Sequence, residues 1–216
     1  MLMRKIVALV FILGCGASAA LAQSRNIEIT PFGGAKLGGK IAVNSPNTDN
    51  ILIKSSVDYG ALFDYGFWDT FQAEFMWNRQ PTSLSAHNPN DGTVAKLSNI
   101  NLDAYQFGIL YNFRDTQAKV RPFFGAGVGF THFGKATDSQ GQSILPFGNR
   151  LSYNIGGGVK YYFDRFVGLR LDARWMPSRT TTGQGVVCDQ FGQCFQSLIH
   201  NHANQFPINL GLIFRF

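Results

Sequence analysis

Apolar and polar residues alternate along most of the chain from about residue 26 onward. Side chains of a β-strand point to its two faces in turn, so a period of two indicates strands with one apolar face and one polar face. The alternation recurs in eight segments. The predicted strands centre on residues 26–37, 57–65, 71–77, 105–113, 124–130, 151–163, 167–175 and 206–216.

The lengths of these strands and of their connections indicate a membrane barrel. We expect strands of nine or more residues, whereas strands of soluble domains usually have about five or six, and a tilted membrane strand has about 9 to 11. Short turns near 66–69, 114–119 and 164–165 alternate with long polar connections at 39–54, 80–99, 134–149 and 177–203. Outer-membrane barrels have short periplasmic turns and long external loops. The predicted fold is therefore all-β, an eight-stranded antiparallel up-and-down transmembrane β-barrel with four extracellular loops.

Composition supports this prediction. The chain is 45% apolar, 14% aromatic and only 15% charged, with a mean hydropathy of -0.03. Beyond the N-terminus no run approaches the ~18 apolar residues of a membrane helix. A soluble barrel or sandwich is the alternative, but it would carry more Lys and Glu on its outer face. Aromatic residues near the two strand ends predict two girdles: Tyr65, Phe67, Trp68, Phe113, Phe163, Phe166, Phe214 and Phe216 at one rim, and Trp77, Phe130, Tyr153, Trp175 and Phe206 at the other.

The first 22 residues have the features of a secretory signal peptide. Arg4 and Lys5 precede an apolar block, and Ala20-Leu21-Ala22 forms an A-x-A cleavage site. We therefore divide the chain into a signal peptide at 1–22 and an outer-membrane barrel at 23–216. An alternative stays open, because the residues before Cys15 resemble a bacterial lipobox, in which Cys15 would be lipidated.

Cleavage lowers the formal charge from +6 to +4, which is too small an excess to indicate nucleic-acid binding. Cys188 and Cys194 remain in the exported chain, and two neighbouring cysteines in an oxidising compartment predict a disulfide. So short a loop contributes only about 2 kcal/mol on the entropy model.

Three segments resemble a known family: residues 121–130 (RPFFGAGVGF), 156–163 (GGGVKYYF) and 210–216 (LGLIFRF). Together they resemble the small eight-stranded outer-membrane barrels, such as the outer-membrane protein A transmembrane domain and the OmpX and OmpW types. The resemblance covers about residues 24–216. It implies that Leu212, Phe214 and Phe216 form the signal read by the barrel-assembly machinery.

Charged residues at polar-face positions should lie in the lumen, which in an eight-stranded barrel is just wide enough to be filled by side chains. We predict an ion-pair network there. Counting from the periplasmic strand ends pairs Glu28 with Arg215 and Glu74 with Arg170, and the network also includes Asp172 and Lys160.

No motif carries convincing chemistry. Residues 129–136 nearly match a P-loop, but Ala136 lacks the hydroxyl that binds Mg²⁺. His200 and His202 are too few for a metal site. A barrel lipid A deacylase would need Ser and Glu after its His, and neither stands in the required place. We therefore predict no catalytic, metal or cofactor-binding residues.

The predicted function is that of a monomeric outer-membrane protein with a structural or surface role, surrounded by outer-membrane lipid and displaying its loops to a surface ligand. A narrow small-solute or ion channel is the alternative, and a lipid-modifying enzyme is a more distant one. Fold alone does not decide among these classes.

Overall fold

The computed structural model describes residues 27–45, 48–87, 92–134, 148–180, 184–188, 194–198 and 201–216. The predicted signal peptide, Cys15 and Ala136 lie outside these ranges. Every regular element within them is a β-strand. Over the same ranges, no helix has the length and apolar character needed to cross a membrane.

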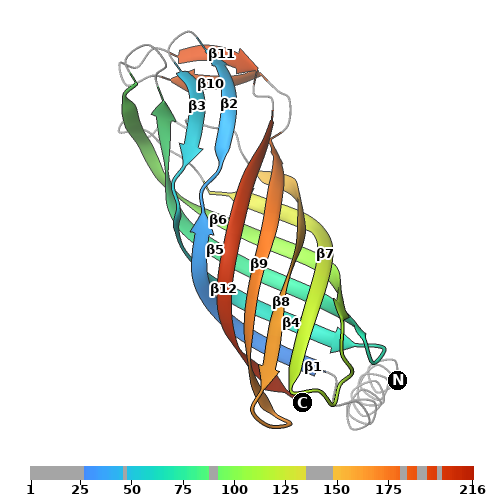
Figure 1. Ribbon diagram of the computed structural model, residues 1–216. Coiled ribbons are helices and arrows are strands. Elements are labelled where there is room, and N and C mark those ends of the chain that lie inside the picture. The colour runs from blue at the N-terminus through green and yellow to red at the C-terminus, as the bar shows by residue number, and fades with distance from the viewer. Residues whose placement is uncertain are drawn as a thin grey trace, which may run out of the picture.

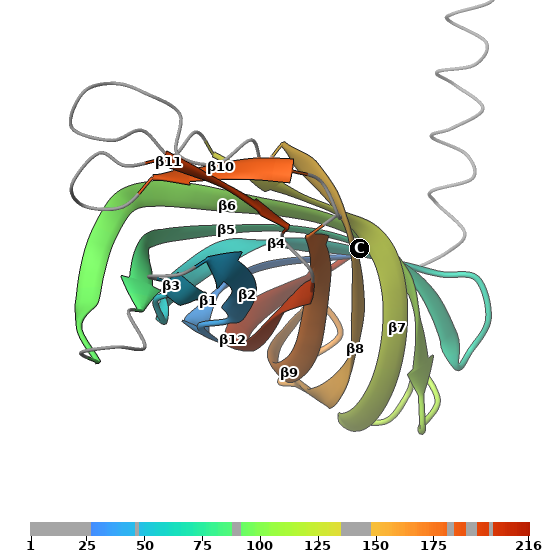
Figure 2. The same ribbon diagram turned by 90° about the horizontal axis from the view of Figure 1, so that it is seen from above.

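Eight strands close into an antiparallel barrel (Figures 1 and 2). They are β1 (Ile27–Leu37), β4 (Ser56–Gly66), β5 (Phe71–His87), β6 (Val94–Asn112), β7 (Val120–Phe133), β8 (Asn149–Tyr162), β9 (Val167–Thr180) and β12 (Asn201–Arg215). Each of these strands pairs with the next along the chain, and β12 pairs with β1 to complete the ring. The predicted eight-stranded antiparallel barrel is confirmed.

The wall is apolar on its outside and polar on its inside. Val57 is 65% exposed and Phe107 60%, whereas Glu28, Lys160 and Arg170 are almost completely buried. From Phe206 in β12 to Phe216 just after it, every second residue is apolar and exposed. In a soluble domain the apolar side chains lie inside and the polar ones outside, so this arrangement is the reverse. It follows from the alternation, because the outside of the wall faces lipid and not water.

The turns at the end of the barrel that holds the C-terminus are short, as predicted (Figure 1). At the opposite end, strands occupy many of the residues that were predicted as long polar connections. Residues 39–54 contain the hairpin of β2 (Lys40–Ser45) and β3 (Thr48–Ile53), and β5 and β6 extend through most of 80–99. Beyond the bilayer the outer face of a strand meets water, so the apolar alternation fades although the strand continues.

The fourth of these connections contains a second extra hairpin. Strands β10 (Gln184–Cys188) and β11 (Cys194–Leu198) pair with each other in a separate two-stranded sheet. Their register places Cys188 directly opposite Cys194. The long connection predicted at 177–203 is therefore largely strand.

A cluster of buried apolar side chains lies inside the wall toward the outer end of the barrel. The β2–β3 hairpin pairs with the extended part of β5. It contributes Ile41, Ile51 and Ile53 to a buried cluster with residues of β5, β6, β7 and β12. The remaining members of this apolar cap are Leu84, Ile100, Leu102, Phe133 and Ala203. The hairpin that the sequence pattern missed thus supplies three of the eight buried residues of this cluster.

Candidate functional site

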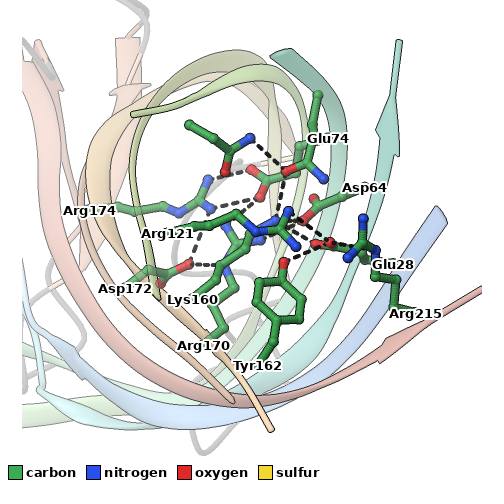
Figure 3. A network of polar contacts seen from close by, with 12 residues as sticks. Glu28, Asp64, Glu74, Arg121, Lys160, Tyr162, Arg170, Asp172, Arg174 and Arg215 are labelled. Atoms are coloured by element: carbon green, nitrogen blue, oxygen red, sulfur yellow. Dashed lines mark hydrogen bonds and ion pairs between the residues drawn. The ribbon is translucent and has the colours of Figure 1, made fainter. Parts of the chain in front are cut away.

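The charged residues of the lumen form two facing rows (Figure 3). Glu28, Asp64 and Glu74 are register partners on the adjacent strands β1, β4 and β5. On the opposite wall, Arg121, Lys160 and Arg170 are register partners on β7, β8 and β9. Like charges side by side in a sheet repel each other. Each row is therefore stabilised by the opposite row across the lumen.

Lys160 connects two members of the acidic row. Its Nζ donates to Glu28 Oε2 at 2.6 Å, to Asp64 Oδ2 at 2.7 Å and to the amide oxygen of Gln72 at 2.8 Å. All three ammonium donors are thus used. The side chain is fully buried, so its charge depends on these partners for solvation.

Glu74 is held between two arginines. Arg170 Nη2 donates to Glu74 Oε2 at 2.6 Å, and Arg174 donates to both carboxylate oxygens at 2.6 and 2.9 Å. The same arginines contact Asp172 at 3.1 and 3.2 Å, and Arg170 also reaches Asp64 at 2.8 Å. A two-point contact of this kind fixes the geometry of both groups as well as their charge.

The network ends near the periplasmic mouth at Glu28. The hydroxyl of Tyr162 donates to Glu28 Oε1 at 2.7 Å. Nitrogen atoms of Arg121 and Arg215 each lie 3.9 Å from the same oxygen. The guanidinium of Arg121 also stacks 3.9 Å from the centre of the Tyr162 ring. These contacts link β1 to β7, β8 and β12 across the lower lumen.

Smaller polar clusters occupy the lumen above the charged rows. Lys36 Nζ donates to Asn78 Oδ1 at 3.0 Å, and the Asn78 amide donates to Asp58. On the other side, Gln106 and Ser152 are joined by a short hydrogen bond. Above these clusters lies the apolar cap. Charged, polar and apolar side chains thus follow one another along the described lumen.

The predicted network residues all lie at these inward positions. The Glu74–Arg170 pair is a direct contact at 2.6 Å, whereas Glu28 and Arg215 are 3.9 Å apart and Lys160 is the nearer partner of Glu28. Sequence reasoning missed Asp64 and Tyr162. Their positions within the alternation, between lipid-facing residues, place both in the lumen and could have identified them.

The acids of the lumen network are already paired with basic side chains. Within the described ranges, no three His, Cys, Asp or Glu side chains come together in a metal-binding arrangement. His132 Nδ1 contacts Asn149 Oδ1 at 2.8 Å on the exposed outer wall, and His202 is exposed on β12. Because every network acid contacts a basic side chain, the arrangement provides cohesion across the barrel.

Comparison with known proteins agrees with the inside-out barrel. Residues 7–216 match the outer membrane protein beta-barrel domain family. The chain belongs to this family. Its place is therefore the outer membrane, as the sequence resemblance implied. Among curated protein sequences, none is similar enough to count as a match.

Solved outer-membrane barrels share the fold at low sequence identity. OprG from Pseudomonas aeruginosa is 16% identical with a TM-score of 0.63, over 88% of this chain and 97% of OprG. Neisserial surface protein A is 13% identical with a TM-score of 0.54, over 89% and 98%. The N-terminal barrel of Pseudomonas aeruginosa OprF is 16% identical with a TM-score of 0.51, over 89% and 98%. At these identities the likeness establishes the fold alone.

Proposed function

We propose that this protein is a closed, non-conducting outer-membrane barrel whose biological activity lies in its external loops. The observation that carries the proposal is the pair of facing charged rows, which joins the wall formed by β1, β4 and β5 to that formed by β7, β8 and β9. An ion entering the lumen would have to separate buried ion pairs, and removing one partner of such a pair costs about 3–5 kcal/mol. The apolar cap is a second barrier, because it offers an ion no polar ligands.

Conductance in planar lipid bilayers tests the closed lumen. Purified protein, shown to be folded by its heat-sensitive shift in gel mobility, is expected to leave the bilayer current at its baseline. A general porin, reconstituted in the same way, provides the positive control. Reproducible current steps from the folded protein would overturn the proposal and favour the narrow-channel alternative.

Loop exchange tests where the activity lies. Replacing residues 135–147 by a short Gly-Ser linker leaves β7 and β8 intact, since these strands end at Phe133 and begin at Asn149. We expect the variant to fold and to lose adhesion of the cells that display it, with unchanged uptake of small solutes. Changed uptake with unchanged adhesion would refute a loop-mediated role.

The proposal includes no catalytic step and no cofactor. It treats the protein as a monomer, because β12 and β1 close the ring within one chain. Leu212 and Phe214 of β12 and the following Phe216 are exposed on the lipid-facing side, and the Phe216 N–H donates to the Ile27 carbonyl at 2.9 Å. We propose that this apolar row is what the assembly machinery reads before β12 meets β1.

We also propose a disulfide between Cys188 and Cys194. The register of β10 and β11 supports one by placing the two cysteines directly opposite each other. Mass spectrometry after alkylation is expected to find both thiols protected in exported protein until a reductant is added. Alkylation of both without reductant would exclude the bond.

A further inference from the structure

The lipid-facing band of the barrel has a sharp outer limit on β1 and β4. On β1 its apolar residues run from Ile29 to Leu37, and on β4 from Tyr65 to Val57. Both spans fit the length of a tilted membrane strand. Lys40 and Lys54 stand three residues beyond these limits. Both lysines therefore lie at the depth of the lipid headgroups.

A groove of about 540 Å³ opens on the outer wall at this depth. Its polar lining consists of Lys40, Lys54 and Lys96 with Ser55, Ser83 and Ser85. All three lysines are exposed. None of the described residues lining the groove is acidic, so three positive charges share one concave surface without a carboxylate.

Backbone contacts hold the groove in shape. The Gly38 N–H donates to Ser55 Oγ at 2.9 Å, and the Lys54 N–H donates to the Ser83 carbonyl at 3.0 Å. A Cβ on Gly38 would collide with the Ile53 carbonyl. Glycine is therefore required where the link from β1 to β2 lies against the link from β3 to β4. Lys40, which follows the first link, and Lys54, which lies in the second, are thus carried by a fixed frame.

A neighbouring basic residue on the same wall has an acidic partner, unlike the three lysines. Arg79 lies on β5 and pairs with Asp103 of β6 at 2.7 and 3.0 Å. No described residue forms a comparable ion pair with Lys40, Lys54 or Lys96. The groove thus has an excess of positive charge where the membrane surface presents its own charged groups.

We propose that this groove binds the phosphate of a phosphorylated glycolipid in the outer leaflet of the outer membrane. Charge complementarity selects the phosphate, and the serine hydroxyls add hydrogen-bond donors. The source is a lipid because the groove lies on the outer wall directly above the lipid-facing band, outside the lumen. The exposed side chains of Leu37 and Val57, at the outer limit of the band directly below the groove, supply apolar contact for the acyl chains of the lipid.

Native mass spectrometry of the detergent-solubilised protein tests the site with defined lipids. The probes are a bisphosphorylated lipid A-type glycolipid, its dephosphorylated form and soluble pyrophosphate. The test variant combines Lys40→Gln, Lys54→Gln and Lys96→Gln. A matched control combines Arg114→Gln, Lys119→Gln and Arg165→Gln, which removes three exposed charges from the periplasmic turns.

The wild-type protein is expected to bind the phosphorylated glycolipid about tenfold or more tightly than the dephosphorylated form. A basic residue near an anionic surface contributes about fivefold in affinity. The test variant should therefore lose about tenfold or more of this binding, and the control less than about twofold. All three proteins must show the same gel shift of the folded barrel.

Three results would overturn the proposal. Equal binding of the phosphorylated and dephosphorylated lipids would remove the role of phosphate. Equal losses in the test and control variants would indicate nonspecific charge attraction. Pyrophosphate that binds as tightly as the lipid and displaces it would indicate a site for a soluble anion. None of these results depends on whether the lumen conducts, so this proposal can fail separately from the proposed function.

Discussion

Replacing Glu74 by Gln provides the most direct test of the charged rows. The substitution keeps the size and shape of the side chain and removes its charge. In the native barrel Glu74 receives three hydrogen bonds, at 2.6, 2.6 and 2.9 Å, from Arg170 and Arg174. Both arginines are buried and cannot move into water. In the variant, the buried guanidinium groups of Arg170 and Arg174 therefore lose one negative charge that offsets their own.

The expected loss of stability follows from this arrangement. Breaking a buried ion pair by removing one partner costs about 3–5 kcal/mol. Arg170 keeps Asp64 and Asp172 as partners, and Arg174 keeps Asp172. Because these acids remain as partners, we expect the loss of stability to be near 3 kcal/mol, at the lower end of that range. A neutral hydrogen bond alone would be worth only about 1 kcal/mol.

Urea unfolding in lipid vesicles, followed by tryptophan fluorescence and gel shift, measures the change. With a slope of about 1–3 kcal/mol per molar urea, the midpoint should fall by about 1–3 M. Asp69→Asn serves as the control, since Asp69 is exposed in a periplasmic turn and should change stability by less than about 0.5 kcal/mol.

A double variant separates the charge argument from a general packing defect. Glu74→Gln combined with Arg174→Gln should lose clearly less stability than the sum of the two single variants, because the second change removes one of the stranded cations. A midpoint for Glu74→Gln equal to that of the control, or strictly additive losses, would refute the account of the lumen given above.

Two further predictions concern the wall and a turn. Gly158→Ala should destabilise the barrel by about 1–3 kcal/mol in the same urea assay, because its Cβ would press on the Leu171 carbonyl of β9. Gly148 lies in open space, so the control Gly148→Ala should change stability little. Equal losses of stability in the two variants would contradict this prediction. At Asp164, two backbone N–H groups of its turn hold the pKa of the carboxyl below its usual range. The Asp164 carboxylate should stabilise the folded barrel above about pH 4, and this stabilisation should disappear as the pH falls through the lowered pKa. An NMR titration that gives an ordinary pKa for Asp164 would contradict the prediction.

Much of the barrel could be predicted from the sequence because lipid imposes a simple rule. Every second residue of a membrane strand must be apolar, so Val57, Phe107 and the β12 positions up to Phe216 reveal both the strand and its outward face. The rule acts only inside the bilayer. For that reason the β2–β3 hairpin and the outer parts of β5 and β6 escaped prediction.

Within the lumen, the same alternation determined which side chains point inward but not which ones meet. Parity along each strand places Glu28, Asp64 and Lys160 inside. Their contacts depend on the tilt of the strands and on the register around the ring, which align the acids on one wall with the bases on the other. The sequence by itself thus determined the fold and the inward position of the charges, because these follow from local periodicity. Only the tertiary structure decided that Lys160 joins Glu28 to Asp64 and that β2 and β3 contribute to the apolar cap, because both depend on contacts between distant strands.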